Sequence, residues 1–143
     1  MLKYGSVDLE NFFDIQTFDK CEVKKYNPQV LAFVGDAVYT LFIRQVMVNN
    51  HNLKSGELHK LSTSYIKASG QSDITLKIMP LLTEDELEVF KRGRNYKTHS
   101  VAKNSKITDY KRATGFEAIL GYLYLSGDYK RINELLMVVK DEN

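Results

Sequence analysis

The chain has 143 residues, of which 43% are hydrophobic and 27% are charged. This length and composition are ordinary for a globular protein that buries its own core, so we expect one domain spanning 1–143. The net charge of +2 is too small to identify a partner. A single cysteine, Cys21, excludes an internal disulfide framework and any multi-cysteine zinc site. We see no apolar run long enough to cross a bilayer and no signal-peptide pattern, which predicts a cytoplasmic protein without a membrane partner.

A long apolar helix is predicted within 24–48. Asn27 suits the N-cap and Pro28 the first helical position, where its missing N–H costs nothing. Apolar residues then recur at helical spacing, and most of the helix surface should be buried: Val30, Leu31, Val34, Ala37, Val38, Leu41 and Phe42. Asp36 is the lone carboxylate among them and follows Gly35. A buried carboxylate needs an ion-pair partner, a helix end to cap or a metal.

Three further helical stretches are predicted between 55 and 93. Ser55 can cap the first, which we expect Ser69 and Gly70 to interrupt. The next stretch is perturbed by Pro80 near its end. Residues 83–86 have the sequence of a capping box that opens a third helix, and Gly93 should end it.

The stretch 91–112 is strongly basic, with eight positive residues and one negative residue, Asp109. Polar residues are interleaved with the charges, a mixture that suits phosphates and sugar hydroxyls. Such a run fits a solvated face as well as a nucleic-acid interface. The candidate RNA-binding residues are Arg92, Arg94, Asn95, Lys97, Lys103 and Lys106.

A last helical pair is predicted from 111 to the end of the sequence. Glu117 is isolated among apolar residues in the first of these helices, as Asp36 is in the long helix. Gly127 should end that helix and Asp128 should cap the next, whose apolar positions are Ile132, Leu135, Leu136 and Val139. No segment shows strand alternation, so the predicted fold class is all-α.

The two isolated acids, each close to a glycine, indicate a site for a hard metal. Mg²⁺ takes few protein carboxylates and fills its shell with water and substrate phosphate. On spacing alone this signal is weak, because a lone Asp in an apolar helix more often forms an ion pair.

The residues around the two acids strengthen the signal. The stretch 33–38, Phe-Val-Gly-Asp-Ala-Val, resembles the signature helix of the ribonuclease III family. The stretch 115–118, Gly-Phe-Glu-Ala, resembles the second catalytic segment of that family, and 91–95 resembles its basic turn. The three motifs occur in the family's order within about 27–127. Within the family, the chain resembles the short Mini-ribonuclease III branch, which lacks an appended double-stranded-RNA-binding domain.

This resemblance implies an all-helical ribonuclease III endonuclease-domain fold, a homodimer and a double-stranded RNA substrate. In the Mini branch the substrate is typically the stem that flanks the 23S ribosomal RNA precursor. Asp36 and Glu117 would be the catalytic and metal-binding residues, with Mg²⁺ as the cofactor and Mn²⁺ able to substitute. Cleavage would leave 5′-phosphate and 3′-hydroxyl ends.

Two positions depart from full-length ribonuclease III. Ala32 stands where that family usually has a Glu, and Thr114 stands where it has an Asp. The number of bound Mg²⁺ ions therefore stays open, as does a role for the Thr114 hydroxyl. One alternative is a non-catalytic RNA-binding or scaffolding protein on the same fold. Another is an all-α protein-interaction module, which leaves both acids and the basic stretch unexplained.

Overall fold

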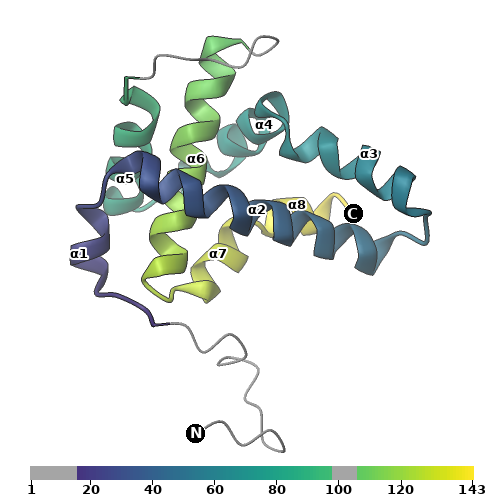
Figure 1. Cartoon of the computed structure of the whole chain (residues 1–143), viewed down its shortest axis with the longest axis horizontal. Helices are drawn as coiled ribbons and strands as arrows, with labels where there is room; N and C mark the ends of the chain where they lie inside the picture. Colours follow the sequence, from purple (N-terminus) through teal and green to yellow (C-terminus); the bar gives the residue numbers. More distant parts are fainter. Residues whose placement is uncertain (1–15, 98–105) are drawn as a thin grey trace, which may run out of the picture.

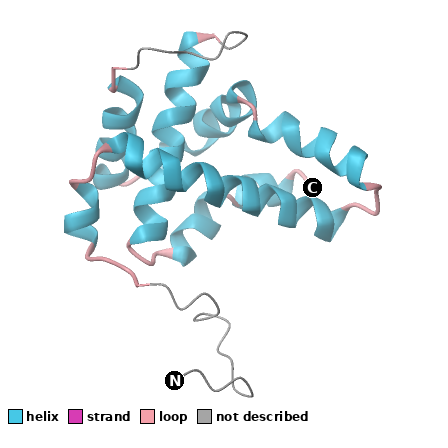
Figure 2. Cartoon of the chain, viewed as in Figure 1, coloured by secondary structure: helices cyan, strands magenta, loops and turns pink. Residues whose placement is uncertain are grey.

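Helices make up all the regular structure in residues 16–97 and 106–143, which are the residues that the computed structural model describes (Figures 1 and 2). The predicted all-α class is confirmed. In chain order the elements are α1 (Lys20–Lys24), α2 (Pro28–Asn50), α3 (Ser55–Ile66), α4 (Ala68–Ile78), the 3₁₀ turn η3 (Met79–Leu81), α5 (Glu84–Asn95), α6 (Ile107–Leu125), α7 (Tyr129–Leu135) and α8 (Met137–Asp141). Helix α6 packs against α2, α4 and α5 and forms the centre of the fold (Figure 1).

Helix α2 begins where the sequence predicts. The Asn27 side chain accepts a hydrogen bond from the Gln29 N–H at 2.8 Å, and Pro28 is the first helical residue. The expectation that most of its surface is buried is wrong for a single protomer. Val30 is 50% exposed and Leu41 61% exposed. The apolar positions wrap around more than one face, and the neighbouring helices cover only the face that carries Leu31, Ala32, Gly35, Tyr39, Ile43, Val46 and Met47.

The expectation that no apolar run is long enough to cross a bilayer is wrong for α2. Its 23 residues are long and apolar enough, by length and composition alone, to cross a bilayer. The core helix of a soluble protein passes the same test. Here α2 packs against α3, α5 and α6, which accounts for its buried apolar residues.

Two predicted helix ends lie elsewhere because their glycines serve another purpose. The break between α3 and α4 falls at Lys67, and Gly70 lies inside α4. Helix α5 runs past Gly93 to Asn95. A Cβ on Gly70 would overlap the carbonyl oxygen of Ser64, and one on Gly93 would lie 3.0 Å from the Cα of Gly115. Both glycines therefore allow close contact between helices.

Of the other predicted helix ends, those of α5, α6 and α7 are confirmed and the cap of α3 is wrong. Thr83 and Glu86 form the capping box of α5, with both reciprocal hydrogen bonds present. Gly127 follows α6 with a φ of +76°, and the Asp128 side chain caps α7. Ser55 does not cap α3: it is the first helical residue, and Lys54 occupies the cap position without a side-chain hydrogen bond.

Helices α2 and α6 cross with their backbones in contact. A Cβ on Gly35 would overlap the carbonyl oxygen of Glu117, and a Cβ on Gly121 would overlap the carbonyl oxygen of Leu31. Each glycine therefore meets the backbone of the opposite helix. A close-packed interior cannot absorb a methyl group at such a contact without moving one helix.

We predict that Gly35→Ala separates α2 from α6 and lowers the free energy of unfolding by about 3 kcal/mol or more. Gly56→Ala is the matched control, because Gly56 lies in α3 and nothing lies within 4 Å of an added Cβ there. That control should stabilise the protein by up to about 1 kcal/mol through helix propensity. Urea unfolding of both variants measures the difference, and equal stabilities would contradict the crossing.

Candidate active site

A hollow of about 270 Å³ opens on the surface where α2 crosses α6. Both predicted catalytic residues line it, together with polar and aromatic neighbours from the same two helices: Gln29, Ala32, Phe33, Asp36, Tyr110, Thr114 and Glu117. The two acids are far apart in sequence, and the glycine contact at Gly35 brings them to one place. The pairing of Asp36 with Glu117 follows from the fold.

The two carboxylates differ in their surroundings. Asp36 is exposed, so the expectation of a buried Asp36 is wrong within one protomer. It follows the crossing glycine and lies on the edge of α2 that α6 leaves uncovered. Glu117 is partly buried and accepts a hydrogen bond from Nε2 of Gln71 at 3.4 Å.

Burial, the negative charge of Asp36 and a hydrogen bond to the Asp36 carboxyl group raise the pKa of Glu117 to about 8. The Gln71 hydrogen bond acts in the opposite direction. Two carboxylates held together without a cation repel each other, and one of them keeps its proton. Such a pair is a strong candidate for a functional site, because the folded protein retains a repulsion that a cation would relieve.

The two positions at which this sequence departs from the family pattern, Ala32 and Thr114, line the same hollow. The Thr114 hydroxyl donates its proton to the carbonyl oxygen of Tyr110 at 3.0 Å. Its oxygen therefore has only lone pairs left to offer. It can accept a hydrogen bond from a water molecule in the hollow.

The donors present fit a hydrated divalent cation. In the described ranges, no group of three or more His, Cys, Asp or Glu residues is placed to hold a metal. Zinc and other tightly held metals need such a group, whereas Mg²⁺ keeps several waters and is held by one or two carboxylates. Asp36 and Glu117 supply that number, and their mutual repulsion favours a cation between them.

Sequence reasoning missed some of the residues around the two acids. Gln71 lies in the stretch that looks like a helix break, and nothing in its spacing connects it with Glu117. Tyr110 was assigned to the basic stretch, whereas here it lines the hollow with Asp36. Only the helix crossing brings these residues together, so a single sequence gives no signal for them.

The candidate RNA-binding residues gather near the end of α5. Arg92, Asn95 and Lys97 line a second hollow together with Pro28 and Tyr96. Arg94 stacks over the Phe90 ring, with 5.5 Å from its guanidinium carbon to the ring centroid. Lys106 is exposed at the start of α6, and Lys103 lies outside the described residues.

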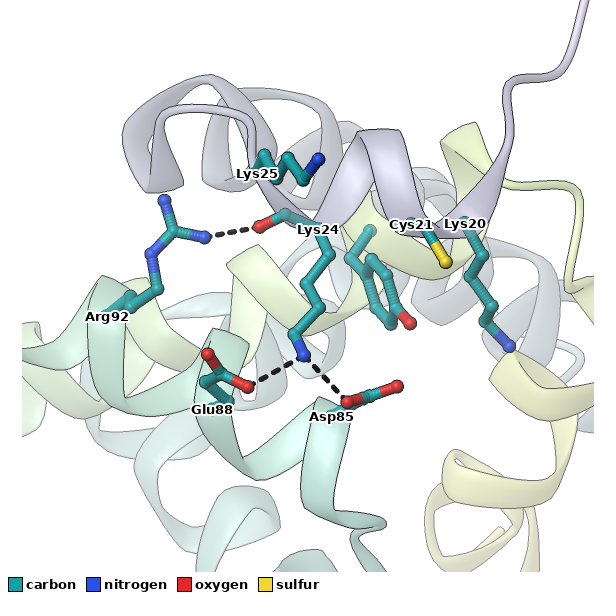
Figure 3. A pocket seen from close by; sticks show the side chains of 8 residues that line it. Lys20, Cys21, Lys24, Lys25, Asp85, Glu88 and Arg92 are labelled. Atoms are coloured by element: carbon teal, nitrogen blue, oxygen red, sulfur yellow. Dashed lines mark hydrogen bonds and ion pairs between the residues drawn. The ribbon is translucent and has the colours of Figure 1, made fainter.

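Arg92 also has a structural role. Its guanidinium donates a hydrogen bond to the carbonyl oxygen of Lys24, at the end of α1 (Figure 3). It donates another to the carbonyl oxygen of Tyr26, just after that helix. In the same view, Lys24 bridges Asp85 at 2.8 Å and Glu88 at 2.7 Å. Lys24, Asp85 and Glu88 line the hollow between α1 and α5 and are paired with one another, so we interpret this part of it as a structural contact.

Comparisons with known proteins agree with this geometry. The Ribonuclease III domain model matches residues 29–128. Mini-ribonuclease 3 of Clostridium tetani is 42% identical over 132 residues, covering 92% of this chain and 87% of that protein. Mini-ribonuclease 3 of Brevibacillus brevis is 49% identical over 110 residues, covering 77% of this chain and 82% of that protein. A crystal structure of a protein from Fusobacterium nucleatum has a TM-score of 0.75 at 32% identity, covering 85% of this chain and 98% of that one.

The helical fold and the carboxylate pair at the α2–α6 crossing define a nuclease domain of the ribonuclease III type. The chain belongs to the Mini-ribonuclease 3 branch of the ribonuclease III family and is an endoribonuclease. The non-catalytic alternative and the interaction-module alternative are therefore set aside.

The raised pKa of Glu117 predicts a pH-dependent stability in metal-free protein. Folded protein holds this proton up to about pH 8, whereas a free Glu releases it near 4.5. The folded state therefore binds more protons between these values, and the free energy of unfolding should fall as the pH rises, by roughly 1.4 kcal/mol per unit at most.

The measurement is urea unfolding from pH 5 to 8 in the presence of a chelator. Glu117→Gln cannot ionise, so it should lose this part of the slope and gain most stability relative to the parent at pH 8. Equal slopes for the two proteins would show that Glu117 titrates normally.

Proposed function

We propose that this endoribonuclease cleaves double-stranded RNA in the cytoplasm, with Mg²⁺ held by Asp36 and Glu117 and with Mn²⁺ able to substitute. The proposed substrate is a structured precursor, most specifically the stem at the ends of the 23S ribosomal RNA precursor. The products carry 5′-phosphate and 3′-hydroxyl ends. The observation that carries the proposal is the juxtaposed carboxylate pair at the α2–α6 crossing.

The proposed chemistry is hydrolysis of a phosphodiester bond. A bound divalent cation would lower the pKa of a water molecule and neutralise charge on the phosphate. Asp36 and Glu117 hold the cation at the edge of the hollow, where a phosphate can reach it from solvent. Thr114 accepts a hydrogen bond from a water there, because its own proton is committed to Tyr110.

The basic end of α5 extends this site along the RNA. We propose that Arg92, Arg94, Asn95, Lys97, Lys103 and Lys106 contact the phosphate backbone. Support comes from the hollow that Arg92, Asn95 and Lys97 line together with Pro28, the first residue of the helix that carries Asp36. Lys97 and Lys106 are exposed and suit this role, whereas Arg92 would combine it with its hydrogen bonds to α1.

We further propose a homodimer that is formed through the outer face of α2. Phe33 is 80% exposed, Leu41 61% and Val48 62%. These apolar residues are exposed along α2, and exposed apolar side chains that recur on one helix suit contact with another protein chain. A second copy would bring a second carboxylate pair, so each site could cut one strand of a duplex.

We predict that Asp36→Asn and Glu117→Gln abolish metal-dependent cleavage of an RNA duplex and leave helix content unchanged. Each change keeps the shape of the side chain and removes a charge that holds the cation. The measurement is single-turnover cleavage with the product ends mapped, and duplex binding without divalent metal serves as the folding control. Substantial Mg²⁺-dependent cleavage by either variant would overturn the catalytic assignment.

We predict that Leu41→Asp converts the dimer to a monomer, because a charge would be buried in the apolar interface. Leu76→Asp is the matched control: Leu76 is 55% exposed, but it lies on α4. Sedimentation velocity at micromolar concentration should show a dimer for the parent and for the control. A monomeric parent would contradict the proposed interface.

A further inference from the structure

Gln71 is a buried polar residue beside the candidate active site. It lies in the first turn of α4, and only 4% of its surface is exposed. The preceding residue, Gly70, lets this turn approach the backbone of α3 at Ser64 and Tyr65. A primary amide in such a place loses its contact with water, so its hydrogen bonds must be found within the protein.

Only the nitrogen end of the Gln71 amide has hydrogen-bond partners among the described residues. Nε2 donates to the carbonyl oxygen of Ile66 at 2.8 Å and to Oε2 of Glu117 at 3.4 Å. The other end, Oε1, is buried and has no hydrogen-bond partner in the part of the chain that the structure describes. Turning the amide over would set Oε1 against the carbonyl oxygen of Ile66, which can only accept, so this neighbour fixes its orientation.

The hydrogen bond to Ile66 is structural, but it does not account for the contact between the amide and Glu117. A buried acceptor without a partner costs free energy, and an apolar side chain of similar size would avoid that cost. In return the amide gains two hydrogen bonds, of which the one to Ile66 joins α4 to the end of α3 and the one to Glu117 reaches the candidate site. That hydrogen bond joins the Glu117 carboxyl group to α4 and so restrains its position in the hollow.

We propose that Gln71 is a positioning residue of the metal site, which holds the Glu117 carboxylate beside Asp36 through its amide N–H. This inference rests on the proposed metal role of the two acids. Ligand-orienting groups outside the first shell typically change metal affinity by 10–100-fold when they are lost. The hydrogen bond here is long, so we expect a loss near the lower limit, about tenfold.

The test uses Mn²⁺ alone as the probe and measures its binding to the full chain by electron paramagnetic resonance, without RNA. Gln71→Met keeps the size of the side chain and removes the donor. Gln71→Asn keeps the amide but shortens its reach. Both should raise the Mn²⁺ dissociation constant about tenfold, and both should need correspondingly more Mg²⁺ for single-turnover cleavage.

Thr75→Val is the matched control. Thr75 is fully buried one turn further along α4, and its hydroxyl donates its hydrogen bond to the carbonyl oxygen of Gln71 and not to Glu117. It should shift the urea midpoint and leave Mn²⁺ affinity at the parent value. Gln71→Met should weaken Mn²⁺ binding, and any shift of its urea midpoint reflects the hydrogen bond to Ile66 that it also loses.

The outcomes separate this inference from the proposed function. If the parent binds Mn²⁺ no better than Asp36→Asn, the metal site itself is wrong. If the parent binds Mn²⁺ and both Gln71 variants match it, Gln71 does not position Glu117. Equal weakening by Thr75→Val would show that α4 packing, and not the amide, controls the site, which also overturns the inference.

Discussion

The contact between the backbones of α2 and α6 at Gly35 and Gly121 is the constraint on which the site depends. Without side chains at these positions, the two helices approach until the carbonyl oxygens of Glu117 and Leu31 touch the opposite backbone. Asp36 follows one of the contact residues, and Glu117 is another. The acids therefore meet because they flank the closest point of the crossing, and a small change in helix separation would act directly on the distance between them.

The same crossing explains what the sequence could and could not predict. Helix starts at Asn27 and Thr83 and the end at Gly127 depend on local hydrogen bonds or local backbone preference, so local signals sufficed. Gly70 and Gly93 were wrongly predicted to interrupt or end helices, because each of them makes room for the backbone of another helix. The Asp36–Glu117 pairing came from the family resemblance, and Gln71 had no signal because its contacts join three helices that spacing alone does not bring together.

The exposed face of α2 shows a further limit of pattern reasoning. Periodicity identifies apolar positions but does not say what covers them, so Val30 and Leu41 look like core residues although α6 packs elsewhere. One helix thus has three distinct surfaces: a glycine contact with α6, an acidic edge at the hollow and an apolar face open to a second protein chain.

The crossing has a consequence for the order in which the protein folds. Helix α2 leaves the ribosome well before α6, since Gly35 and Gly121 are separated by most of the described sequence. Until α6 follows, α2 presents apolar residues on its inner and outer faces alike. Closing a chain segment of this length precedes the gain from burial, which slows folding and exposes the chain to aggregation. The nascent chain therefore passes through its most vulnerable stage while its longest helix lacks the partner that defines the active site.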